Sequence, residues 1–212
     1  MFITKRRAVA SAIIAKQSSH WILAVTLWAC LGAMTLESYF PASFPQHWHR
    51  WYAKHLSAMK EPSLLAQREN TGIESYRFLW LRTFHNPISI RVENRNSGGK
   101  LWITRLSVKG GYDPGSVLAQ KTIEITATQW EDITNTISSA GFWDMPSEDD
   151  NRSSADGAQW ILEGLKQGRY HVVDRWSPKE ESNNKRALER YVAACVGFLK
   201  LADLDLAKEK VY

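Results

Sequence analysis

The feature that most constrains the fold of this chain is the regular alternation of apolar and polar residues over residues 156–178. Two alternating runs of six or more residues flank a break that contains Gly168. Such a pattern predicts the two strands of a β-hairpin, because successive side chains of a strand point to opposite faces. The fold is therefore expected to contain an antiparallel sheet.

The loop of this hairpin decides which side chains share a face. A three-residue loop, residues 166–168, pairs Leu165 with Arg169 and fixes every later pair along the two strands. A two-residue loop shifts the pairing by one residue. The three-residue loop separates apolar from polar side chains more cleanly, and the sequence favours it for that reason.

In the two-residue alternative, Glu163 would share a face with Tyr170 and Val172. In the favoured register one face is apolar and the other is mostly polar. The apolar face carries Ala158, Trp160, Leu162, Tyr170, Val172 and Trp176, and the other carries Gln159, Ile161, Glu163, Arg169, His171, Val173 and Arg175. Trp160 and Trp176 are accordingly expected in the core.

The polar face contains the one close group of ionisable residues that suggests a site. In the favoured register Glu163 lies directly opposite His171, and Arg169 and Arg175 lie on the same face. One interpretation is a small binding site in which Glu163 orients His171 while the two arginines attract an anion. The other is an ordinary solvated sheet face, where opposite charges stabilise the strand pair by about 0.2–1 kcal/mol per pair.

Charge is concentrated at the N-terminus. Residues 1–20 hold four of the 27 basic residues and none of the 22 acidic ones, so the remaining chain has a net charge of +1. An even balance of this kind gives no basic face for a phosphate backbone, and no nucleic-acid partner is expected. The two cysteines, Cys30 and Cys195, lie in an apolar run and in a predicted helix, so no disulfide framework is expected.

Residues 17–36 contain no Lys, Arg, Asp or Glu, and residues 21–36 are almost wholly apolar. That length just spans a bilayer core, so residues 21–40 are predicted to be a transmembrane anchor. Because the nearby positive charge precedes the run, residues 1–20 are placed in the cytoplasm and the rest outside. The predicted location is the inner membrane, with a single span and a periplasmic C-terminal domain. A cleaved signal peptide, which would release the protein into the periplasm, is the alternative.

Residues 41–73 are predicted to be a juxtamembrane segment. Residues 46–60 carry apolar and aromatic side chains at helical spacing, which predicts a short amphipathic helix on the outer leaflet, followed by a linker. His47, His49 and His55 lie in this helix, but His47 and His49 face differently and no acidic or cysteine ligand is near. No metal or other cofactor is expected.

Residues 74–204 are predicted to form one α+β domain, and residues 205–212 a tail. The first helix is marked by a capping box of Thr128 and Glu131 and by apolar residues at helical spacing up to Gly141. The order ββββαββα predicts an antiparallel sheet of about six strands with two helices on one face. Strands are expected at residues 76–84, 88–94, 101–108, 122–126 and in the 156–178 hairpin, and the second helix at about 185–201.

Several motifs resemble a group of uncharacterised bacterial proteins over about residues 74–202. They are YRFLWLRTF at residues 76–84, FW at 142–143, DGAQWILEG at 156–164 and GRYHVVDRWSP at 168–178. The resemblance implies a bacterial origin and a similar folded domain. It implies no activity.

These features favour a binding or interaction protein over an enzyme. The expected function is capture of a protein or an anionic envelope ligand by a membrane-anchored extracytoplasmic domain, through Glu163, Arg169, His171 and Arg175. The alternative is a hydrolase-type enzyme that uses Glu163 and His171 as an acid/base pair. The sequence offers no placed nucleophile for it, and no catalytic residue is assigned.

Overall fold

The computed structural model describes residues 38–95, 98–110, 113–148, 156–181 and 186–211. They belong to one compact unit that runs from Glu37 to Tyr212. The elements are α1 (Gln46–Ala58), η1 (Ala66–Glu69), β1 (Glu74–Arg82), β2 (Ile88–Arg95), β3 (Gly98–Leu106), β4 (Val117–Thr126), α2 (Ala127–Ser139), η2 (Phe142–Asp144), β5 (Ala158–Lys166), β6 (Arg169–Trp176), α3 (Pro178–Glu181), α4 (Arg186–Leu201) and α5 (Leu206–Glu209).

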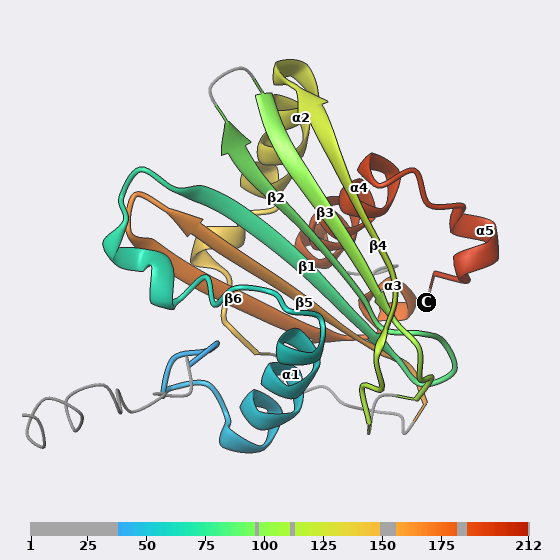
Figure 1. Cartoon of the computed structure of the whole chain (residues 1–212). Helices are drawn as coiled ribbons and strands as arrows, with labels where there is room; N and C mark the ends of the chain where they lie inside the picture. The colour runs from blue at the N-terminus through green and yellow to red at the C-terminus, as the bar shows by residue number, and fades with distance from the viewer. Residues whose placement is uncertain (1–37, 96–97, 111–112, 149–155, 182–185, 212) are drawn as a thin grey trace, which may run out of the picture. The chain divides into compact units, whose positions relative to one another are not determined.

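The six strands form a single antiparallel sheet in the order β4-β3-β2-β1-β5-β6 (Figure 1). This confirms the α+β class and the six-stranded antiparallel sheet expected from the sequence. β1 lies next to β5, which follows it by more than seventy residues, and β4 and β6 are the two edge strands. The strand bounds match the expected ones closely, apart from β4, which begins five residues earlier than predicted.

One face of the sheet is apolar and packs against α2 and α4 (Figure 1). Trp160 is fully buried there between Phe78 and Trp80, with ring centroids 5.4 and 5.6 Å away. Cys195 of α4, predicted to be packed, is fully buried on the same side. Trp160 is thus a core residue as expected, whereas Trp176 is only partly buried.

α2 begins two residues earlier than the sequence analysis predicted. Its N-cap is Thr126, not Thr128, and the reciprocal partner of the capping box is Gln129, not Glu131. Both pairs fit the same motif spacing, and the pair nearer the end of β4 is the one formed. Gly141, with φ of 70°, ends the helix as expected, because glycine adopts the left-handed conformation without strain.

α1 packs on the opposite face of the sheet (Figure 1). A second hydrophobic cluster lies between α1 and this face. It contains Tyr52 and Leu56 of α1, the following Met59, and Leu79 and Ile161 of the sheet. This corrects the expectation of a helix whose apolar side lies on a lipid leaflet, because the sheet already covers that side. Residues 38–73 therefore pack as part of the same compact unit as the sheet.

The predicted membrane anchor falls mostly outside the described residues. Within the described ranges, no helix is both long and apolar enough to cross a membrane. The last residues assigned to the anchor do appear, and Phe40 is fully buried in the cluster beneath α1. The folded unit thus begins before residue 41.

The hairpin of β5 and β6 has the two-residue loop, which corrects the predicted register. Lys166 pairs with Arg169, and Gln167 and Gly168 both have positive φ, 51° and 78°. Two successive positive φ values are the mark of a type I′ turn, whose twist suits the flanking strands. Every pair along β6 is therefore shifted by one residue from the expected one, and Glu163 lies opposite Val172.

The predicted tail is also structured. Residues 206–209 form α5, and the Glu209 carboxylate accepts hydrogen bonds from Arg82, at 2.9 Å, and from Arg105. Arg82 is almost completely buried and stacks on Trp80, with its guanidinium carbon 4.0 Å from the ring centroid. The C-terminal turn is thereby held against the ends of β1 and β3.

Candidate functional site

The structure does not bring the four predicted site residues together on one face. Glu163 lies on the α1 face of the sheet, whereas His171 and Arg175 lie on the α2/α4 face. The shifted register is the reason, because a one-residue slip moves a side chain to the other face. The proposed Glu163 and His171 pair, on which both the binding site and the acid/base alternative depended, is not formed.

Arg169, His171 and Arg175 instead hold the segment that follows α2. Their side chains donate hydrogen bonds to the carbonyl oxygens of residues 143, 145 and 146. The bonds are Arg169 Nη2 to Trp143 O at 2.7 Å, His171 Nε2 to Met145 O at 3.0 Å and Arg175 Nη2 to Pro146 O at 2.8 Å. These three hydrogen bonds give each side chain a structural role in holding the partly exposed segment against β6.

His171 is a neutral donor in this arrangement. Its ring packs edge-on against Phe142, with centroids 5.0 Å apart. Burial lowers the pKa of His171, and the hydrogen bond to the Met145 carbonyl opposes that shift only in part. The bond to a carbonyl places the proton on Nε2.

Glu163 belongs to a buried ion-pair network on the α1 face. Arg77 donates to it through Nε, at 2.7 Å, and through Nη2, at 2.8 Å, in a bidentate pair, and both side chains are completely buried. Tyr170 adds a third donor at 3.0 Å. Burial raises the pKa of Glu163, and the contacts with Arg77 and Tyr170 counteract that rise. The carboxylate has no free position for a substrate.

The same network ties the segment before β1 to the sheet. Arg77 Nη1 donates to the Pro62 carbonyl at 2.6 Å and lies 3.5 Å from the Glu61 carboxylate. Arg91 on the neighbouring strand donates to the same carboxylate at 2.8 Å. These contacts are structural, since a buried charge is tolerated only when it is paired and hydrogen-bonded.

β4 and β6 are the two edge strands, so each has backbone groups that point away from the sheet, and the β6 edge is the one that lies beside a pocket. Ser177 N–H donates inward to Ala158 O, whereas Asp174 N–H donates outward to Ser147 O, at 2.7 Å. Since the two directions alternate along an antiparallel strand, Tyr170 and Val172 also point their N–H and C=O groups outward. Among the described residues, neither has a backbone partner on that side.

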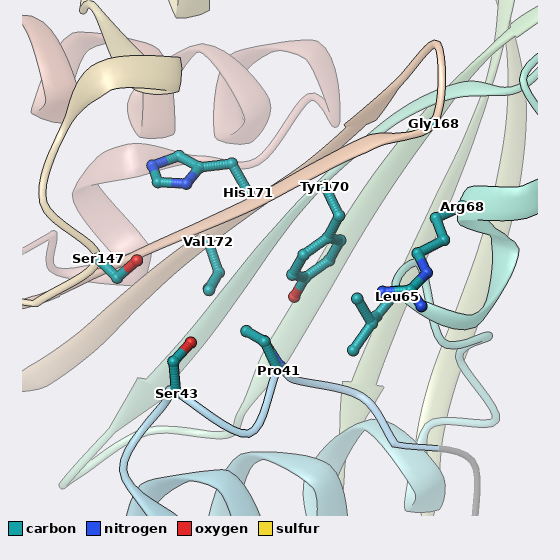
Figure 2. A pocket seen from close by; sticks show the side chains of 9 residues that line it. All are labelled: Pro41, Ser43, Leu65, Arg68, Ser147, Gly168, Tyr170, His171 and Val172. Carbon is teal, nitrogen blue, oxygen red and sulfur yellow. The ribbon is translucent and has the colours of Figure 1, made fainter.

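A pocket of about 350 Å³ lies at this edge (Figure 2). Its lining residues are Pro41, Ser43, Leu65, Arg68, Ser147, Gly168, Tyr170, His171 and Val172. Figure 2 shows the Tyr170 ring directed toward Pro41 and Leu65, whereas the His171 ring lies on the other side of the β6 ribbon. A volume of this size is in the range of ligand pockets.

The pocket combines apolar walls with a few polar groups. Pro41, Leu65 and the Tyr170 ring are apolar, and the exposed Arg68 side chain adds a positive charge, 3.4 Å from Glu69. Burial, followed by the nearby Glu163 carboxylate, raises the pKa of Tyr170 well above its ordinary value. The hydroxyl therefore stays protonated and is unsuited to act as a base. Ser43, Ser147 and His171 are in the lining, but among the described residues no hydrogen bond joins either serine to the imidazole, whose Nε2 bonds to Met145 O.

Sequence reasoning missed most of this pocket because its walls come from three distant segments. Pro41, Ser43, Leu65 and Arg68 lie in the stretch assigned to a juxtamembrane helix and linker. The two-residue turn decides which residues of β6 point outward, and the sequence pattern favoured the other loop length.

Fold and site together define a six-stranded antiparallel α+β domain with a pocket at one sheet edge. Across the described ranges, no group of three His, Cys, Asp or Glu residues is placed to hold a metal ion. No protein-family model matches the chain, and no curated protein matches its sequence significantly.

Proposed function

We propose that this protein is a single-pass bacterial membrane protein whose extracytoplasmic domain binds an extended polypeptide segment at the β6 edge. The observation that carries the proposal is the outward direction of the Tyr170 and Val172 backbone groups beside the pocket, where Tyr170 is partly exposed and Val172 is 1% exposed. Alternating N–H and C=O groups match the backbone of an added β-strand, which is a common way to recognise a peptide.

The segment after α2 supports this mode of binding. Met145 has extended backbone angles, φ −68° and ψ 142°, and Ser147 O accepts the Asp174 N–H. An extended stretch of the chain itself therefore already lies along one half of β6. The pocket occupies the other half, beside the hairpin turn.

The pocket walls indicate which peptides fit. Leu65, Pro41 and the Tyr170 ring offer apolar contact, and Arg68 offers a guanidinium at the rim. A segment with one apolar side chain and a neighbouring acidic one satisfies both. Backbone hydrogen bonds supply affinity in this mode, and the side-chain contacts supply specificity.

Peptides selected from a random library on the detergent-solubilised full chain test the site. Bound peptides are expected to slow hydrogen exchange at the Tyr170 and Val172 amides, whose N–H groups face the pocket, without further slowing Val173. Arg68→Glu should weaken the acidic peptides, whereas Arg190→Glu, an exposed change on α4, should not. Slower exchange only at amides outside β6 would contradict binding at the β6 edge.

The membrane anchor rests on the uncharged run of residues 17–36 and the basic residues before it. A periplasm-active reporter fused to the C-terminus is expected to be active, and a cytoplasmic one silent. The reverse result would overturn the orientation. A mature chain that lacks its first residues and leaves the membrane fraction would establish the cleaved-signal alternative.

A further inference from the structure

The outer side of α1 carries a basic and aromatic stripe. Positions 47, 50, 51 and 54 have the pattern i, i+3, i+4, i+7, which places them on one side of a helix. They are His47, Arg50, Trp51 and Lys54. His47, Arg50 and Lys54 are exposed, and Trp51 is partly exposed.

This stripe is distinct from the side of α1 that packs on the sheet. The packed side contains Tyr52, His55 and Leu56, all fully buried. The stripe is offset from them by more than a third of a turn about the helix axis. Trp48 lies nearer the packed side, stacked on Tyr52, and its ring centroid is 5.7 Å from that of Trp51; both indoles pack in part against the hydrophobic cluster beneath α1.

The segment that carries the stripe is basic, and Asp113 is the acidic residue whose charge reaches α1 at His55. No Asp or Glu occurs from residue 38 to residue 60, and Lys60, just after α1, is exposed. Arg50, Lys54 and Lys60 thus add three positive charges to a surface segment with no carboxylate of its own. Such a surface is complementary to a negatively charged partner.

We propose that the stripe of α1 binds the surface of an anionic phospholipid bilayer. This inference rests on the membrane anchor of the proposed function, since α1 begins six residues after the predicted span in the sequence. Trp side chains favour the headgroup region, and each Lys or Arg near an anionic surface strengthens binding about fivefold. The interaction uses the polar outer side of α1, while the apolar side remains packed on the sheet.

An acidic protein would also satisfy the charge of the stripe. The paired, partly exposed indole rings of Trp48 and Trp51 favour the lipid surface, because amphipathic rings beside cations are typical of helices at membrane interfaces. A bilayer also presents anionic headgroups along the whole length of the helix. The proposal therefore commits to phospholipid.

Lysine footprinting on the reconstituted full chain tests the proposal. The chain is placed in vesicles of phosphatidylcholine alone or with about one third phosphatidylglycerol, and a neutral, membrane-permeable amine reagent is added. We expect Lys54 and Lys60 to react several-fold more slowly in the anionic vesicles. Lys121 on β4 and Lys200 on α4, both exposed, serve as internal controls and should react alike in both.

Two further measurements, one at high salt and one on a variant with a charge removed, test whether the protection is electrostatic. Because the Debye length falls to about 3 Å at 1 M salt, the slower reaction of Lys54 and Lys60 should disappear there. Arg50→Gln should reduce the protection of Lys60 in the anionic vesicles. The matched change Arg190→Gln, on the exposed side of α4, should leave it unchanged.

The outcomes separate the inference from the anchor. Equal reaction of Lys54 and Lys60 in both vesicle types, in a chain that resists carbonate extraction, would overturn the inference and keep the anchor. A chain that carbonate extracts, but whose two lysines are still protected by anionic vesicles in low salt, would keep the inference and remove the anchor.

Discussion

At the scale of single residues, the charged side chains of the strands are interior groups. Glu163 was expected on a polar sheet face, yet it is buried, and so are Arg77 and Arg91 on neighbouring strands. Their partners lie far away in the chain, as Glu163 is 86 residues from Arg77. A strand pattern tells which residues share a face, but not whether another segment covers that face.

We predict that Arg77→Met lowers the free energy of unfolding by about 3–5 kcal/mol, because it leaves a buried carboxylate without its cation. Denaturant unfolding of the solubilised chain measures it. Arg95→Met is the control, since that side chain is 54% exposed and should cost little.

The double change Arg77→Met with Glu163→Met should recover part of this loss, because both charges are then removed together. Single losses that simply add in the double variant would contradict the coupling of the pair.

His55 supplies a pH dependence at the same scale. Its ring is fully buried, Nδ1–H donates to Trp51 O at 2.9 Å, and burial lowers the pKa, with Lys54 adding to the shift and Asp113 opposing it. The unfolded chain therefore takes up a proton first as pH falls below about 6.5. Stability from the neutral ring is present above that pH and is lost as pH falls toward the lower folded-state pKa.

We predict that His55→Gln loses less stability between pH 8 and pH 5 than the unchanged chain does. Denaturant unfolding at the two pH values gives the comparison. His171, whose pKa is also lowered by burial, contributes its own part in both proteins. An identical loss in the two proteins would show that His55 is protonated in the folded state.

At the scale of elements, periodicity predicted the strands and helices well and the register poorly. The apolar stripes of α2 and α4 and the alternation in β1 to β3 are local properties, so the sequence contains them in full. The register of the β5 and β6 hairpin depends on a turn in which Gln167 adopts a left-handed conformation. That is uncommon for glutamine, and the pattern gave no reason to expect it.

We predict that Gln167→Asn stabilises the hairpin by about 0.5–1 kcal/mol, because Asn-Gly is a preferred type I′ pair and asparagine tolerates a positive φ. Thermal unfolding should show a higher Tm. The exposed neighbour Lys166 ends β5, and Lys166→Asn should give no gain, since asparagine is unfavourable in strands. A lower Tm for Gln167→Asn would argue against the two-residue turn.

At the scale of the whole molecule, the sheet has two covered faces. The sequence predicted the layer of α2 and α4 and missed the layer made by residues 38–73. The reason is physical: the second layer buries a mixed face on which apolar residues such as Leu79 and Ile161 lie beside Arg77 and Glu163. A mixed face resembles a solvated one when only one strand is considered. The pocket was missed with it, because that layer forms its outer wall.

We predict that residues 38–212 unfold cooperatively, whereas residues 74–212 do not. The shorter fragment would expose Leu79, Leu81 and Ile161 and leave Arg77 without its contacts to Glu61 and Pro62. Circular dichroism with thermal denaturation compares the two fragments. A cooperative transition of equal Tm in the shorter fragment would show that the second layer is dispensable.

The position of the buried charges also determines how the domain withstands a pull on its N-terminal side. Ser38 O accepts the Ser63 hydroxyl, Tyr39 O lies 3.3 Å from the Tyr170 hydroxyl oxygen, and Glu61 pairs with Arg77 and Arg91. Force entering at residue 38 is thus spread over contacts to β1, β2 and β6 at once. Contacts that are loaded at the same time resist a pulling force better than contacts that break one after another. The N-terminal segment should therefore stay attached to the sheet under a force that would detach a single edge strand.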